Sequence, residues 1–228
     1  PDNFEGVIIA NEVCDAMPLH RVQFEQGQLL EIGVGHQKGL LEWHTTRLSN
    51  PALKARCEQI LPQLTHLPYQ TEIALQASAW LATLSQMLSK GAIYLVDYGY
   101  EAKTYFHSSK HQGLLRCNYR HQVHENPLVL VGLQDITAHV DFTALAETAS
   151  QNGLHVEGFQ RQSDFLLAGD ILELAQMQQI HDFAQIQQAA ALKRLLLPDL
   201  MGEQFKVLSL AKELELPRSK SADLRYCL

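Results

Sequence analysis

The sequence lacks any excess of basic residues and any hydrophobic run long enough to span a bilayer as a helix. Its 228 residues include 18 Lys and Arg against 25 Asp and Glu, a formal net charge of −7. Binding to nucleic acid or to an anionic membrane relies on basic patches, and a transmembrane helix needs about 20 consecutive apolar residues. We therefore expect neither nucleic acid nor a membrane as a partner.

Cysteine is scarce, and the four that occur are widely scattered, without a CxxC pair: Cys14, Cys57, Cys117 and Cys227. This usage is typical of a cytosolic protein rather than of a disulfide framework or a zinc site. Four histidines lie close together, at positions 107, 111, 121 and 124, but carboxylate or cysteine partners are missing at matching intervals. We therefore predict no metal site.

The sequence also lacks the short motifs that identify common nucleotide and hydrolase sites. It contains no GxSxG nucleophile turn, no Walker phosphate loop and no GxGxxG dinucleotide fingerprint. Any catalytic site must therefore be found from polar residues placed at the ends of predicted strands.

One such placement occurs in the stretch GVIIANEVCDAMP, residues 6–18. The run Val7–Ala10 is continuously apolar and rich in β-branched residues, as in a strand that is covered on both faces. Asn11, Glu12 and Asp15 follow its carboxyl end, which is the edge where open α/β sheets bind ligands. The alternative is that Asn11 and Asp15 only cap a turn or a helix.

The remainder of the chain alternates helical and strand patterns, which is typical of an α/β fold. Short antiparallel strands are expected at 20–32 and 40–46, forming a β-rich insertion at about 20–48. Helices are expected at 50–60, from about 71 to a stop at Gly91, from an Asp141 cap to Gly153, and at 173–197. Further strands are expected at 92–97, 154–167 and 205–211, the second bent at Gly158.

The second apolar strand, AIYLVDYGY, ends in Asp97 and Tyr98 and is followed by a long segment of weak periodicity at about 100–136. We interpret this segment as a loop on the substrate side. It contains a mixed group of cationic and aromatic residues: Arg116, Tyr119, Arg120 and His121. Such a group can hold a carboxylate or phosphate, and a solvated loop face is the alternative.

Five segments, taken in order, resemble one family. They are GVIIANEVCDAMPLHR, YLVDYG, GLLRCNYRHQVHENPL, GLQDITAHVDFTALAE and GFQRQSDFLL. The family consists of class I S-adenosylmethionine-dependent methyltransferases related to the mitochondrial complex I assembly protein arginine methyltransferase. The resemblance implies a Rossmann-like α/β fold with S-adenosylmethionine as cofactor. It covers most of residues 4–172.

The resemblance also implies roles for the polar residues at the strand ends. Glu12 would orient a substrate guanidinium with Asp15 as its partner, while Asn11 and Glu12 would border the methyl donor. A carboxylate can align a guanidinium through paired hydrogen bonds. The substrate side would then be formed by the Arg116–His121 group and by Asp97, Tyr98, Gln134, Asp135, Thr137 and His139.

The sequence departs from the family in one respect. The glycine-rich donor loop and the acidic ribose-binding residue of the family precede the matching segments and are absent here. The resemblance therefore implies that residues 1–228 are the C-terminal part of a single methyltransferase domain, containing strands 4, 5, 6 and 7 of a sheet ordered 3-2-1-4-5-7-6. Such a segment is expected to be a poor enzyme alone and to self-associate through the exposed strand at residues 6–11.

Three functions remain open at this point. The first is methylation of an arginine side chain in a protein substrate. The second is methylation of a small molecule, which the arginine-rich loop would suit if that molecule is acidic. The third is a non-catalytic assembly or chaperone-like factor that keeps the fold. The expected location is the cytoplasm of a bacterium, or the mitochondrial matrix of a eukaryote.

Overall fold

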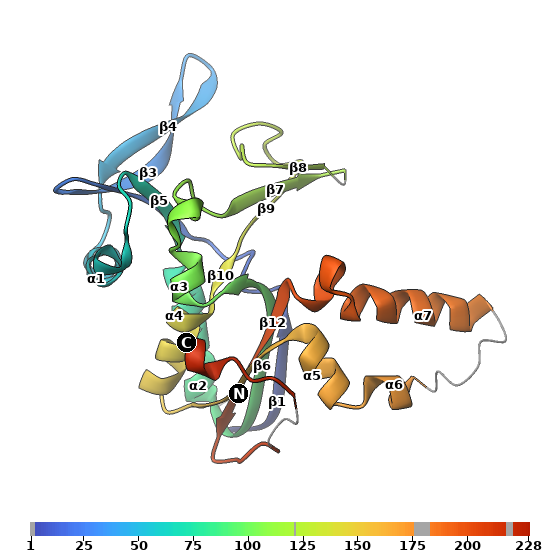
Figure 1. The fold of residues 1–228 in the computed structure, drawn as a ribbon. Coiled ribbons are helices and arrows are strands. Elements are labelled where there is room, and N and C mark those ends of the chain that lie inside the picture. Colours follow the sequence, from blue (N-terminus) through green and yellow to red (C-terminus); the bar gives the residue numbers. More distant parts are fainter. Residues whose placement is uncertain (1–2, 121, 176–182, 218–220) are drawn as a thin grey trace. The chain divides into compact units, whose positions relative to one another are not determined.

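The computed structural model describes residues 3–120, 122–175, 183–217 and 221–228. The chain forms two compact units (Figure 1). Unit 1 contains residues 1–13, 81–99 and 142–228, and unit 2 contains residues 14–80 and 100–141. Each unit is thus assembled from segments that are distant in the sequence.

Unit 1 is built on a sheet with the strand order β1-β6-β12-β11. These strands are Phe4–Asn11, Leu88–Tyr100, Phe205–Lys212 and His155–Arg161. Figure 1 labels β1, β6 and β12 of this sheet. β1 and β6 are parallel, whereas β12 is antiparallel to both of its neighbours. The sheet confirms that the four predicted strands lie together with the last one antiparallel. It also has the order 4-5-7-6 that the resemblance implies.

The core of unit 1 lies on the two central strands and under the helices that cover them. Ile93 and Leu95 of β6 are buried, as are Leu208 and Leu210 of β12. Helices α4 (Phe142–Gln151) and α5 (Gln162–Ala168) pack on β11 and β12. Helices α6 (Ile171–Leu174) and α7 (Phe183–Leu196) follow. Apolar side chains on both central strands thus exclude water from the middle of the sheet.

Unit 2 contains two antiparallel sheets. The larger has the order β4-β3-β2-β5, with bounds Leu40–Arg47, Gln28–Gln37, His20–Glu25 and Tyr69–Ile73. The smaller has the order β8-β7-β9, with bounds Gln122–His124, Leu115–Tyr119 and Asp135–Ala138. β2, β3 and β4 confirm the strands predicted at 20–32 and 40–46.

A shared apolar core holds the larger sheet of unit 2 to its helices. Phe24, Tyr69, Leu53 and Tyr105 are all buried in this cluster. Helix α1 (Pro51–Ile60) begins as predicted, because the Asn50 side chain accepts a hydrogen bond from the Leu53 N–H at 2.8 Å. Helix α3 (Ala102–Tyr105) contributes the ring of Tyr105.

The helix predicted from about residue 71 to Gly91 is wrong at both ends. Residues 71–73 belong to β5, helix α2 spans Leu75–Met87, and Gly91 lies inside β6. A Cβ atom at Gly91 would lie 1.8 Å from the Gly6 carbonyl oxygen, and its φ is +147°. Gly91 is therefore required for the close approach of two strands, and not for a helix stop.

Two other expectations need correction. The strand predicted at 154–167 ends at Arg161 and continues as α5, although its bulge before Gly158 agrees with the expected bend. The predicted loop at 100–136 instead contains α3, β7, β8 and the start of β9. Part of the helix predicted at 173–197 lies outside the described residues, at 176–182.

The remaining elements are short. β10 spans Val140–Asp141, and single helical turns occur at Leu61–Gln63, Ser108–Lys110, Pro198–Gly202 and Arg225–Cys227. Asp141, predicted as a helix cap, directly precedes α4 and forms an ion pair with Arg56 at 3.0 Å. In the described ranges, every helix is too short or too polar to cross a bilayer.

The close approach at Gly91 predicts a strongly destabilising substitution. Gly91→Ala should lower the free energy of unfolding by about 2 kcal/mol more than Gly153→Ala, since both residues have positive φ but only Gly91 lacks space for a methyl group. Urea denaturation of the two variants measures this difference. Equal losses would contradict the predicted clash.

The exposed apolar residues of β1 predict self-association of the 228-residue chain. β1 ends the strand order of its sheet, and Val7 and Ile9 are 57% and 72% exposed. A strand edge of this kind invites pairing with another chain. We expect light scattering of a dilution series to show oligomers that Ile9→Lys reduces. Leu174→Lys, at an exposed leucine outside β1, should not. An equal effect of both variants would contradict association through β1.

Candidate active site

The carboxyl end of β1 holds Asn11 and Glu12, as predicted. The Glu12 N–H donates to the Val96 carbonyl of β6 at 2.9 Å, and the Asn11 amide donates to Glu12 Oε1 at 3.2 Å. Both residues are exposed, and the φ of Glu12 is +49°. A glutamate in this left-handed region is uncommon, and such strain gathers at functional sites.

Asp97 and Tyr98 lie on the neighbouring strand, one and two residues after Val96, the partner of Asn11 in the parallel register. Asp97 is 2% exposed, and its Oδ1 accepts a hydrogen bond from the Tyr98 N–H at 2.9 Å. The Tyr98 ring packs edge-on against Phe205, with centroids 5.6 Å apart. Within unit 1, the structure thus gathers these four predicted residues at one edge of the sheet.

Asp15 belongs to unit 2. It is 5% exposed, and its backbone carbonyl accepts a hydrogen bond from the Ala138 N–H at 3.1 Å. The structure therefore places Asp15 beside the end of β9. Its partnership with Glu12 stays a prediction.

Four other predicted residues lie on or next to the small sheet of unit 2. Arg116 of β7 is paired in register with Thr137 of β9, whose side chain is buried. His139 follows β9 and stacks on Tyr100 with centroids 5.2 Å apart, while its Nδ1 lies 3.3 Å from the Leu114 carbonyl oxygen. Asp135 is exposed at the start of β9.

The turn after β7 and the segment before β9 supply the other predicted residues. The Arg120 guanidinium lies 5.3 Å from the centre of the Tyr119 ring. The Gln134 amide donates to the carbonyls of Pro127 and Val129 at 3.0 and 2.7 Å, so Gln134 holds the loop that precedes it. His121 lies outside the described residues.

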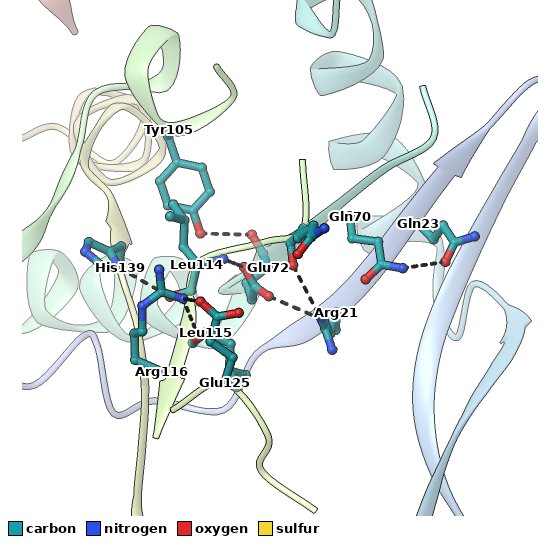
Figure 2. Close-up of polar contacts among 11 residues, drawn as sticks. Arg21, Gln23, Gln70, Glu72, Tyr105, Leu114, Leu115, Arg116, Glu125 and His139 are labelled. Carbon is teal, nitrogen blue, oxygen red and sulfur yellow. Dashed lines mark hydrogen bonds and ion pairs between the residues drawn. The ribbon is translucent and has the colours of Figure 1, made fainter. Parts of the chain in front are cut away.

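Sequence reasoning missed a buried carboxylate at Glu72 (Figure 2). Glu72 Oε2 accepts a hydrogen bond from the Leu114 N–H at 2.6 Å, and its Oε1 lies 3.5 Å from Nε of Arg21. The Tyr105 hydroxyl donates to the Glu72 backbone carbonyl at 3.3 Å. The cluster joins β2 and β5 to the segment before β7.

Burial raises the pKa of the Glu72 carboxyl above its ordinary value, against the opposing effects of the Leu114 hydrogen bond and the charges of Arg21 and Arg116. A sequence signal for Glu72 exists. Thr71 and Ile73 are β-branched and flank it after Pro68, which favours a strand. Because a helix is predicted at these residues, the burial of Glu72 is not predicted from the sequence.

A metal centre has no support in the described part of the chain. No group of three or more His, Cys, Asp or Glu residues there could hold a metal ion.

The fold agrees with the comparisons to known proteins. Residues 1–160 match the model of a family described as "Putative S-adenosyl-L-methionine-dependent methyltransferase". The chain belongs to this family.

Solved structures support the same assignment. A crystal structure of a COG1565 superfamily member from Burkholderia thailandensis, bound to S-adenosyl-homocysteine, is 33% identical with a TM-score of 0.88. The whole of this chain aligns with that structure and covers 59% of its length. A native structure of a COG1565 superfamily protein from the same organism gives the same identity and TM-score, with 61% of its length covered.

A curated relative belongs to Drosophila melanogaster and is called "Protein arginine methyltransferase NDUFAF7 homolog, mitochondrial". It is 25% identical over 92% of this chain and 48% of its own length. The chain therefore spans about half of this relative, and about three fifths of the solved family members.

The buried carboxylate predicts a pH-dependent stability difference. The folded state holds the Glu72 proton more tightly than the unfolded state, because burial raises the pKa of this carboxyl above its ordinary 4.5. Ionisation of Glu72 therefore lowers the free energy of unfolding, with no effect well below pH 4.5 and a growing effect as the pH rises through the raised pKa. Glu72→Gln removes this effect and keeps an acceptor for the Leu114 N–H.

We expect the wild-type chain to lose stability relative to Glu72→Gln as the pH rises from about 4.5. Urea denaturation at a series of pH values measures the difference. Glu58→Gln serves as control, since the Glu58 side chain is 58% exposed. Parallel pH profiles for wild type and Glu72→Gln would contradict the prediction.

Proposed function

We propose that this chain forms part of an S-adenosylmethionine-dependent methyltransferase that acts on an arginine side chain of a protein. The observation that carries the proposal is the sheet order β1-β6-β12-β11 with Asn11 and Glu12 at the carboxyl edge of its parallel strands. Ligands of open α/β sheets bind at that edge. The family match and the S-adenosyl-homocysteine bound to a structural relative support the cofactor.

The polar groups at the end of β1 fit a cationic ligand. Glu12 is exposed there, and the Asn11 amide holds its carboxylate. S-adenosylmethionine, when bound, supplies an electrophilic methyl group beside a positively charged sulfur. Asn11 and Glu12 would border that donor, as the family resemblance implies.

Glu12 has the chemistry needed to position an arginine. Its carboxylate can accept two hydrogen bonds from a guanidinium and balance its charge. The backbone hydrogen bond from Glu12 to Val96 fixes where this residue lies on the sheet. Methyl transfer needs in-line alignment of the acceptor nitrogen, so a fixed carboxylate contributes by orientation. Asp15 would assist as the partner of Glu12, as the resemblance implies.

We propose a reducing compartment as the cellular location. All four cysteines are free, and three of them are buried. Such usage is typical of a reducing compartment. The bacterial cytoplasm and the mitochondrial matrix both fit this chemistry, and the Drosophila relative is called mitochondrial.

Substitution of Glu12 tests the proposal in the complete protein. Glu12→Gln should lower the rate of methyl transfer by about 10²-fold, on the scale of losing a positioned charged group, without loss of stability. Transfer of radiolabelled methyl groups to protein substrate measures the rate. Glu5→Gln, at an exposed glutamate of the same strand, should leave it unchanged. Activity within twofold of wild type in Glu12→Gln would remove Glu12 from this role.

Calorimetric titration with S-adenosylmethionine separates an enzyme from a non-catalytic factor that keeps the fold. The complete protein is expected to bind the donor, and the 228-residue chain to bind it far more weakly. Failure of the complete protein to bind would favour the assembly or chaperone-like alternative.

A further inference from the structure

Unit 2 contains a groove of about 970 Å³ that the residues discussed for methyl transfer in unit 1 do not line. It lies between β4, which contributes Leu40 and Trp43, and the segment after β8, which contributes Glu125 and Val129. Arg21 and Arg116 also line it, from β2 and β7. The groove therefore combines apolar side chains on exposed elements with two guanidinium groups.

Arg21 is held in place from three directions. Its Nε lies 3.5 Å from Oε1 of the buried Glu72, and its Nη2 donates to the Gln112 carbonyl at 3.1 Å (Figure 2). Its guanidinium also lies over the Trp43 ring, 4.9 Å from the centroid. Because the Arg21 side chain is already fixed in this way, it loses little conformational entropy when a ligand binds. A small loss of entropy favours binding.

Arg116 is held differently. Its Nη1 donates to the Leu115 carbonyl at 2.9 Å and forms an ion pair with Glu125 Oε1, also at 2.9 Å (Figure 2). The Glu125 side chain is 66% exposed. An ion pair with so exposed a partner contributes little to stability, so a carboxylate from a ligand can replace Glu125 with little loss.

The two carboxylates near these arginines therefore differ in kind. Glu72 is buried, bound to the Leu114 N–H and in contact with Gly113, where a Cβ atom would lie 2.4 Å from its Oε1. The position of Glu72 is therefore fixed, whereas the Glu125 side chain can rotate away from Arg116 into solvent. Once Glu125 turns toward solvent, Arg116 presents its guanidinium to the groove beside the fixed cation of Arg21.

We propose that this groove binds an extended segment of the protein substrate through an acidic side chain that takes the place of Glu125 at Arg116. The proposal rests on the proposed function for the presence of a protein substrate. A guanidinium binds a carboxylate through paired, charge-assisted hydrogen bonds. The second cation, Arg21, adds to the attraction from the same groove.

Two further observations favour a polypeptide with a single acidic residue. Leu40, Trp43 and Val129 are exposed large apolar residues along the groove, and a chain with apolar neighbours would cover them where a small acid would not. Glu42 also lines the groove and would repel a polyanion.

Variants of Arg116 and Glu125 give opposite predictions. The probe is a set of decapeptides based on one host sequence of Leu, Ala and Arg. In each peptide a single position is replaced by Asp, and a matched peptide carries Asn at the same position. The complete protein should bind the best Asp peptide at least about 10-fold more tightly than its Asn partner, the scale of one charge-assisted hydrogen-bonded contact. Arg116→Gln should abolish this preference, whereas Glu125→Gln should strengthen binding several-fold.

Arg47→Gln is the matched control, because Arg47 is an exposed arginine of β4 that does not line the groove. It should leave the Asp preference unchanged. Should Arg116→Gln fail to fold, Glu125→Gln still decides, since a purely structural ion pair predicts weaker binding rather than tighter. Equal binding of Asp and Asn peptides, no binding at all, or equal losses in Arg47→Gln and Arg116→Gln would overturn the proposal.

Two additional arms separate this proposal from its alternatives. Complete competition by millimolar succinate would overturn it in favour of a small acidic ligand. Because the readout is binding, its failure differs from failure of the proposed function. Donor binding without an Asp preference removes the groove proposal alone, and an Asp preference without donor binding removes the methyltransferase proposal alone.

Discussion

The parallel pairing of β1 with β6 is the constraint on which the candidate active site depends. The two strands approach so closely at Gly6 and Gly91 that a methyl group at Gly91 has no space. From this point the register continues without interruption to Asn11 and Val96. The Glu12 N–H consequently finds the Val96 carbonyl, and Asn11 holds the Glu12 carboxylate. A contact near the amino end of β1 thus fixes the residues at its carboxyl end.

Unit 2 depends on a different constraint, which is the burial of the Glu72 carboxylate in its interior. Taking Glu72 out of water is unfavourable, and the hydrogen bond from the Leu114 N–H to Oε2 and the ion pair of Oε1 with Arg21 offset part of that cost. Apolar residues of similar volume could pack there at equal or better stability. The retained charge instead sets the position of Arg21, and so ties the geometry of the groove to the interior of the unit.

The predictable part of the structure is the part encoded by local pattern. The apolar runs before Asn11 and Asp97 identified β1 and β6, and Asn50 identified the start of α1. The order of the strands came from the family resemblance, since periodicity does not specify neighbours. The predicted helix includes 71–73 because Ile73 also fits the apolar spacing of the helix that follows, and this spacing outweighed the β-branched residues.

The features that escaped prediction depend on contacts between distant residues or on backbone geometry. Glu72 acquires its environment from Leu114, 42 positions along the chain. The role of Gly91 depends on Gly6, which approaches it only in the folded sheet. The positive φ of Glu12 is likewise a property of the folded backbone, which the type of this residue does not predict.

The division of the chain carries an evolutionary consequence. The chain leaves unit 1 just after β1 and again at the end of β6, and both excursions together make up unit 2. Unit 2 therefore has no continuous coding segment of its own, and a single recombination event that exchanged it would also exchange residues 81–99 of unit 1. The residues that line the groove of unit 2 are expected to change by point substitution and by loop insertion, while the strands of the unit 1 sheet keep their order.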